Sequence, residues 1–124
     1  MVARRVRERR RPDSPRTGPP VRGDVWLVAL DPTRGSEIRK TRPCVVVSPD
    51  ELNAHLRTVI VAPMTSGGRV YPWRVACRFQ GVDGRVALDQ LRTVDGERLV
   101  QRVGALHPAT VATVLATLGE LFAP

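Results

Sequence analysis

Residues 44–65, CVVVSPDELNAHLRTVIVAPMT, hold two runs of small and β-branched apolar residues on either side of a short polar segment. The first run, CVVVSPD at 44–50, is continuously apolar until a serine and a proline end it, as is typical of a strand buried on both faces. The second run, RTVIVAPMT at 57–65, has the same character. Between them, DELNAHL at 50–56 predicts a short helical turn with Asp50 as its cap.

Further strands are predicted on both sides of this segment. GDVWLVAL at 23–30 follows a Gly/Pro break and has the composition of an opening strand. YPWRVACRF at 71–79 alternates apolar and polar residues, which indicates a half-buried strand with Trp73 and Phe79 on its apolar side. The remaining predictions are strands at 86–94 and 98–106, and turns at SGGR (66–69), GVDGR (81–85) and DGE (95–97).

The apolar period changes in HPATVATVLATLGELFAP at 107–124, where spacings of three and four predict an amphipathic helix. Pro108 suits the first helical turn. The apolar positions of this helix are Val111, Val114, Leu115, Leu118, Leu121 and Phe122. Five or six short strands with glycine-bearing turns, followed by one helix, predict a mainly β fold, either a small bent antiparallel sheet or a partly open β-barrel with a C-terminal α-helix.

Length and charge limit the class of protein further. The 124 residues leave room for one domain, and no apolar run approaches the length of a membrane span. The charged start lacks the apolar stretch of a secretory signal, so we expect a cytoplasmic protein. Of the net charge of +8, residues 1–22 supply +6, from eight arginines against Glu8 and Asp13. We expect this proline-rich tail to be disordered and to carry no catalytic residue, and residues 23–124 to form the domain.

The sequence offers little for metal or nucleophilic chemistry. Cys44 and Cys77 lie in apolar runs and lack the paired spacing of a zinc or redox site, so we interpret them as buried, reduced thiols. His55 and His107 have no polar neighbours that would indicate a triad or a metal site. This argues against a two-histidine ribonuclease, and we expect no metal and no other cofactor.

The residues that remain for chemistry are centred on arginine. The loop DPTRGSEIRKTRP at 31–43 is rich in cations and ends in Arg42, whose backbone is biased toward extended geometry by the proline after it. An arginine mounted rigidly at a strand mouth is suited to binding phosphate. Thr65 and Ser66 end the second buried strand at PMTSGG, where their hydroxyls could donate to a phosphoryl oxygen.

Four motifs in order and spacing resemble the MazF/PemK (Kid) toxins of bacterial type II toxin–antitoxin modules. They are RGDVWLVALDPTRGSE (22–37), TRPCVVVSPDELN (41–53), VIVAPMTSGG (59–68) and VALDQLRTVD (86–95). The resemblance covers residues 22 to about 122. It implies an SH3-like, CcdB/PemK-type barrel, a homodimer, and a metal-independent, sequence-specific endoribonuclease of single-stranded RNA. It also implies a cognate, MazE-like antitoxin whose acidic segment docks on the toxin.

Carried over by motif, the resemblance assigns catalytic roles to Arg42 and Thr65, and matches Glu37 to the family's loop glutamate. The general base stays open between Glu37, which we favour, and Asp89. PemK-type members have a histidine and an arginine where this chain has Ser36 and Ala87, so their acid–base scheme does not transfer whole. The predicted RNA-binding or supporting residues are Arg34, Ser36, Arg39, Lys40, Ser66, Tyr71, Asp89 and Gln90, whereas Trp26, Trp73 and Phe79 are interpreted as core or dimer contacts.

Two other hypotheses fit the same fold. One is a CcdB-like toxin that binds DNA gyrase without being an enzyme, and the other is an RNA-binding barrel that has lost activity. The pair of Arg42 and Thr65 at neighbouring strand ends separates the enzyme from the gyrase poison, which does not need them.

Overall fold

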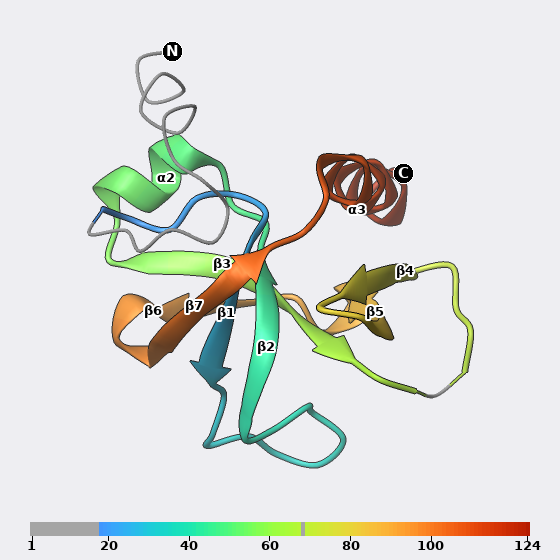
Figure 1. The fold of residues 1–124 in the computed structure, drawn as a ribbon, viewed down its shortest axis with the longest axis horizontal. Helices are drawn as coiled ribbons and strands as arrows, with labels where there is room; N and C mark the ends of the chain where they lie inside the picture. The colour runs from blue at the N-terminus through green and yellow to red at the C-terminus, as the bar shows by residue number, and fades with distance from the viewer. Residues whose placement is uncertain (1–17, 68) are drawn as a thin grey trace.

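The computed structural model describes residues 18–67 and 69–124, and within these the chain folds into one strongly bent antiparallel sheet with helices packed beside it (Figure 1). Seven strands are formed where the sequence predicts five or six. They are β1 (Asp24–Ala29), β2 (Thr41–Val46), β3 (Thr58–Thr65), β4 (Arg74–Phe79), β5 (Val82–Ala87), β6 (Arg92–Asp95) and β7 (Leu99–Ala105). The helices are α2 (Asp50–His55) and α3 (Pro108–Leu121), and two single 3-10 turns are η1 (Leu88–Gln90) and η2 (Gly96–Arg98).

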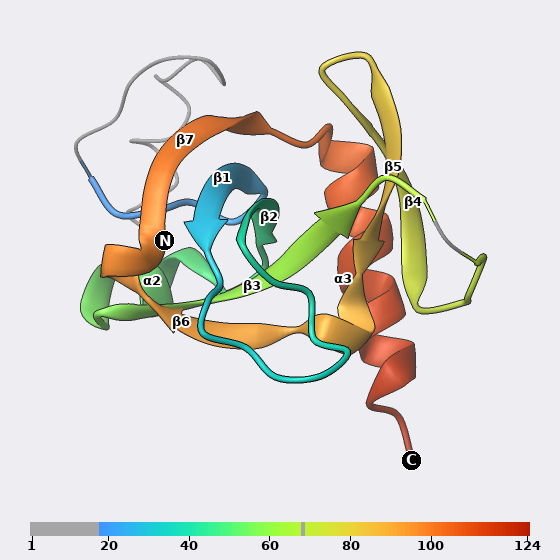
Figure 2. The same cartoon turned by 90° about the horizontal axis from the view of Figure 1, so that it is seen from below.

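Strand β3 organises the sheet, whose order is β4-β5-β3-β2-β1-β7. Along one edge β3 pairs with β2, and along the other it pairs first with β6, from Thr58 to Val61, and then with β5, at Met64 and Thr65. Because β3 exchanges partners halfway along its length, the sheet curls round it, as Figure 2 shows. The prediction of a mainly β, partly open antiparallel barrel with a C-terminal helix is confirmed.

The two apolar runs of residues 44–65 are buried on both faces, as predicted. In β2, Val45 belongs to one hydrophobic cluster, and Cys44 and Val46 belong to a second cluster on the other face. The residues of β3 alternate in the same way, because Ala62 and Met64 join the first cluster and Val59 and Val61 join the second. This alternation follows from the period of two of a β-strand, and it explains why neither run shows a polar face.

Helix α3 covers the first cluster. Val114 is buried in that cluster, and Val111 and Leu118 pack against it. The Nδ1 atom of His107 accepts a hydrogen bond from Ala109 N and caps the helix. The apolar stripe is only partly buried, since Phe122 is 71% exposed. No helix among residues 18–67 and 69–124 is long and apolar enough to cross a membrane.

Three local predictions are wrong. Asp50 does not cap α2, because Pro49 is the N-cap and the Asp50 carboxylate accepts a hydrogen bond from Arg22 N. The strand predicted at 86–94 is divided between β5 and β6 by the η1 turn. The turn predicted at 81–85 is instead a two-residue hairpin at Gln80–Gly81, where both residues have positive φ as the right-handed twist of a hairpin favours.

The contacts of the domain begin slightly before the predicted boundary at residue 23. Val21 N donates to the Asp24 carboxylate, and Arg22 Nε donates to Val47 O. Residues 1–17 of the predicted tail lie outside the described residues.

Candidate functional site

A groove of about 660 Å³ lies between the 31–40 loop and the end of β3. It is bounded by the loop on one side and by the residues that follow β3, together with the first residue of β4, on the other. Its lining carries four cationic side chains and one carboxylate, so its electrostatic potential suits an anionic ligand. The lining residues are Gly35, Ser36, Glu37, Ile38, Arg39, Lys40, Arg42, Thr65, Ser66, Gly67 and Arg74.

Arg42, on β2, is one of the residues that line this groove. It pairs with Val28 of β1, and its Nε donates to Arg39 O at 3.2 Å, which ties the side chain to the end of the loop. This bond uses one of the five N–H groups of a guanidinium, and the other four belong to the two Nη atoms. The Arg42 guanidinium is therefore oriented by this bond, and the bond does not use its four Nη N–H groups.

Thr65 is the last residue of β3 and lines the same groove. Its Oγ1 is buried and has no hydrogen-bond partner within residues 18–67 and 69–124. Such a hydroxyl is costly in a folded protein unless a ligand satisfies it. Its backbone is held closely from β5, because a Cβ on Gly84 would lie 2.6 Å from the Thr65 carbonyl oxygen. Glycine is therefore required at residue 84 for β3 and β5 to meet at this point.

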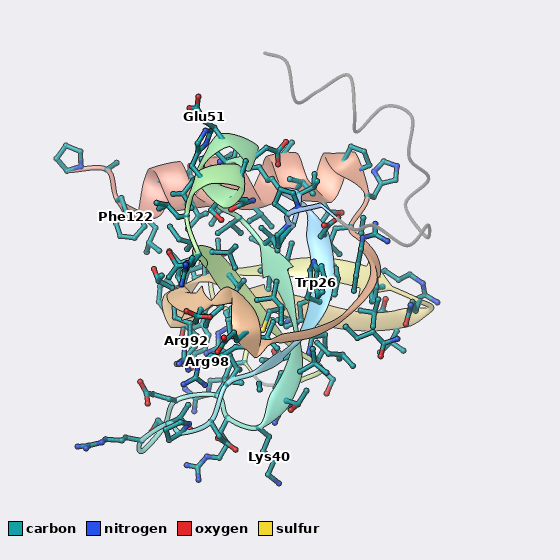
Figure 3. All side chains as sticks on the ribbon, turned by 90° about the vertical axis from the view of Figure 1, so that its left-hand side faces the viewer. Trp26, Lys40, Glu51, Arg92, Arg98 and Phe122 are labelled. Carbon is teal, nitrogen blue, oxygen red and sulfur yellow. The ribbon has the colours of Figure 1, made fainter. Side chains whose placement is uncertain are left out.

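The 31–40 loop is held mainly at its two ends. Arg98 Nη1 donates to the carbonyls of Ala29 and Asp31, and Arg92 Nη1 donates to Leu30 O. Lys40 N closes the loop by donating to the Asp31 carboxylate at 3.0 Å. Figure 3 shows Arg92 and Arg98 near the base of the loop and Lys40 pointing outward from it.

Glu37 lies where the groove meets a second, smaller pocket of about 370 Å³. Its Oε1 accepts a hydrogen bond from Arg34 N, so Glu37 faces its own loop. The smaller pocket also contains Asp89 and Gln90, and Gln90 Oε1 accepts a hydrogen bond from Ile38 N. Asp89 and Gln90 therefore lie beside the groove and not in it.

Arg74, which the sequence analysis did not single out, is part of the groove. Its Nε and Nη2 donate to the two carboxylate oxygens of Asp89, both at 2.8 Å, in a bidentate ion pair. That hydrogen bond from Arg74 is the main reason the pKa of Asp89 lies below its usual range. In the β4–β5 register Arg74 is the partner of Ala87, the residue at which the sequence departs from the arginine of PemK-type members, so this chain has an arginine on the neighbouring strand instead. In the sequence, Arg74 is marked only as a polar residue of the alternating segment YPWRVACRF.

Two residues that were predicted to bind RNA, Arg34 and Tyr71, do not line the groove. The backbone N–H of Arg34 supports Glu37, but Arg34 does not belong to the lining of the groove. Tyr71 stacks on Trp73, with ring centroids 5.1 Å apart, in the turn before β4. Trp73 is 36% exposed and is not a core residue, so of the two predicted roles, core contact or dimer contact, the dimer contact stays a prediction. Trp26 and Phe79 do pack against the core clusters.

The cysteines are buried and free. Burial raises the pKa of the Cys44 thiol to about 12, although Arg92 and Arg42 act in the opposite direction. Burial, with a smaller contribution from Asp83, also raises the pKa of Cys77. Within the described part of the chain, no group of three or more His, Cys, Asp or Glu residues could hold a metal ion.

The described residues form a curled antiparallel sheet, a C-terminal helix and a cationic groove lined by Arg42 and Thr65, which together are the architecture of a small β-barrel protein. A family described as "PemK-like, MazF-like toxin of type II toxin-antitoxin system" matches residues 21–122, and the chain belongs to this family. The resemblance stated from the motifs is thereby confirmed.

Individual relatives agree with this assignment. The chain is 39% identical to "Endoribonuclease MazF9" of Mycobacterium tuberculosis, in a match that covers 73% of this chain and 86% of the relative. It is 41% identical to "Endoribonuclease PemK" of Escherichia coli, over 66% and 68% of the two chains.

Solved structures show the same fold. A crystal structure of MazF from Deinococcus radiodurans matches with a TM-score of 0.74 and 28% identity, over 83% of this chain and 96% of that one. An endoribonuclease from Mycobacterial species, solved in complex with its cognate antitoxin, matches with a TM-score of 0.72 and 26% identity, over 85% and 97%.

Proposed function

We propose that this protein is the toxin of a type II toxin–antitoxin module and acts as a metal-independent, sequence-specific endoribonuclease on single-stranded RNA, thereby inhibiting translation and growth. The observation that carries the proposal is the presence of Arg42 and Thr65 in the lining of one cationic groove, together with the absence of a hydrogen-bond partner for Thr65 Oγ1 within residues 18–67 and 69–124. Membership of the toxin family, and the names of two relatives as endoribonucleases, support it.

The proposed reaction is an internal transesterification of RNA. The ribose 2′-oxygen attacks the adjacent phosphorus and its proton passes to a general base, while the bond to the 5′-oxygen breaks and that oxygen takes up a proton from water. The products are a 2′,3′-cyclic phosphate and a 5′-hydroxyl end. Arg42 and Thr65 stabilise the negative charge that develops on the phosphoryl oxygens, a role that is typically worth about 3–4 kcal/mol for a single donor.

Glu37 is the general base in this scheme. Asp89 is paired on both oxygens with Arg74, and the resulting low pKa makes it a weak proton acceptor. Glu37 lines the groove itself, and its contact with Arg34 N leaves the second carboxylate oxygen for the substrate. Ser36, Arg39, Lys40 and Ser66, which line the groove, bind the RNA around the scissile phosphate.

We propose a homodimer and an antitoxin partner as well. An apolar groove of about 540 Å³ adjoins the candidate site and shares Arg42 and Thr65 with it, and Val82 at its rim is 61% exposed. Burial of such a surface in a second copy of the chain would place two sites near one interface. An acidic antitoxin segment suits the cationic groove, and a related endoribonuclease was solved with its cognate antitoxin. We place the protein in the cytoplasm, where mRNA is available.

The test is to incubate the purified protein, in EDTA, with a long single-stranded RNA and to map the cut sites and end chemistry beside an Arg42→Ala variant. Discrete cuts that leave 5′-hydroxyl ends, and that are absent with Arg42→Ala, are the expected result. Uncut RNA together with inhibition of DNA gyrase would replace the proposal by the gyrase-poison hypothesis. Binding of the RNA without cleavage would replace it by the binding-only hypothesis.

A further inference from the structure

Arg74 differs from the other cations of the groove in how firmly it is held. Its Nε and Nη2 donate to the two oxygens of Asp89, and its guanidinium carbon lies 5.8 Å from the centroid of the Tyr71 ring. Tyr71 in turn stacks on Trp73. Only 18% of the Arg74 side chain is exposed. A carboxylate and an aromatic pair thus fix this guanidinium at the wall of the groove opposite the loop.

The two bonds to Asp89 leave part of the guanidinium for a ligand. A guanidinium has five N–H groups, and the pair uses Nε–H and one N–H of Nη2. Both N–H groups of Nη1 and one of Nη2 are not used by this pair. Three donors on a planar, oriented group match the oxygens of a phosphodiester better than a freely rotating cation does.

We propose that Arg74 is a second phosphate-binding residue of the groove, which contacts an RNA phosphate next to the one held by Arg42, and that Asp89 and Tyr71 are positioning residues for it. This inference rests on the proposed function, since the ligand is the same RNA strand. It gives Asp89 a role other than proton transfer. It also explains why Tyr71 makes an intramolecular stack instead of presenting its ring to a base.

The experiment measures RNA binding apart from cleavage. The probe is a single-stranded RNA that spans a mapped cut site and carries a 2′-deoxy sugar at the scissile position, and its affinity is measured over a range of salt concentrations. Arg74→Ala should weaken binding roughly tenfold or more, as expected for loss of a charged hydrogen-bonding group. It should also reduce the slope of log K against log[salt] by about 0.7, the value for one phosphate contact on a single strand.

The same β4–β5 hairpin provides a matched control. Arg78 forms an ion pair with Asp83, but both side chains are largely exposed, at 65% and 80%, and Arg78 does not line the groove. Arg78→Ala should leave affinity and salt slope as in the wild type. Arg74→Lys, which keeps the charge and is milder for folding, should retain the salt slope and lose part of the affinity.

The Asp89→Ala variant tests whether Asp89 must orient Arg74 or whether only the net charge beside the groove matters. The variant removes a negative charge beside the groove, so affinity should rise if only net charge matters, whereas it should fall if Arg74 must be oriented. An unchanged salt slope in Arg74→Ala, or a gain in affinity in Asp89→Ala, overturns the inference while the wild-type protein still cuts RNA. If the wild-type protein neither binds nor cuts RNA, the proposed function itself fails.

Discussion

The buried hydroxyl of Thr65 should have opposite effects on stability and on activity, and this makes it a sharp test of the site. Its Oγ1 has no partner within the described ranges. Thr65→Val replaces the hydroxyl by a methyl group of nearly the same shape, and valine suits a strand as well as threonine does. We expect RNA cleavage to be lost while the domain becomes more stable.

The magnitudes follow from the burial of the hydroxyl. A buried hydroxyl without a hydrogen bond costs about 1–3 kcal/mol in mutational series, so Thr65→Val should raise the free energy of unfolding by about 1 kcal/mol or more. For a domain of about 100 residues this corresponds to a rise in Tm of roughly 4–8 °C. Removal of one donor to a developing oxyanion should lower kcat about 10²–10³-fold.

Urea unfolding followed by circular dichroism, at one fixed protein concentration, measures the first effect, and cleavage of an RNA with a mapped site measures the second. The control is Thr93→Val, because Thr93 is an exposed threonine on β6 away from the groove, and it should change neither quantity appreciably. A Thr65→Val variant that cuts RNA at the wild-type rate would refute the proposed role of the hydroxyl. One that is destabilised by 1 kcal/mol or more would show that the hydroxyl has a partner in the free protein.

Two further predictions concern the packing around the site. Gly84→Ala should destabilise the domain by about 1–3 kcal/mol in a urea titration and lower cleavage, because the new Cβ would lie 2.6 Å from Thr65 O. The control is Gly119→Ala on α3, where a Cβ would meet nothing within 4 Å, and this variant should be neutral or slightly stabilising. In a Cys77→Ser variant, native Cys44 should resist alkylation at pH 8, since a pKa of about 12 leaves about one thiol in 10,000 ionised, and should react after unfolding in urea; rapid labelling of the native protein would contradict this.

The parts of the fold that could be predicted from sequence are those set by local pattern. The runs at 44–47 and 59–64 are apolar throughout, and the structure places their residues, apart from Pro63, alternately in two hydrophobic clusters. The spacing at 107–124 predicted α3, whose Val111, Val114 and Leu118 meet the core. A continuous apolar run suits a strand that is buried on both faces, and a spacing of three and four suits a helix that is buried on one side.

The parts that could not be predicted depend on partners far away in the chain. Aspartate is a common N-cap residue, but the Asp50 carboxylate accepts a hydrogen bond from Arg22 N, which is 28 residues earlier in the chain. Val82–Arg85 reads as a turn because of its Asp and Gly, yet pairing with β4 makes it a strand. Arg74 belongs to the site only because Asp89, 15 residues later, and Tyr71 hold it there, and no local motif records that pairing.

The way in which the 31–40 loop is anchored affects how this protein can diverge in evolution. Arg92 and Arg98 hold the base of the loop by hydrogen bonds to the backbone carbonyl oxygens of residues 29–31. Every amino acid has such an oxygen, so these bonds do not depend on the side chains of the loop. Substitutions in the middle of the loop, at Ser36 or Arg39, therefore alter the wall of the groove without removing these anchors. Such substitutions would change the groove that we propose binds RNA, while the strands that carry Arg42 and Thr65 stay unchanged.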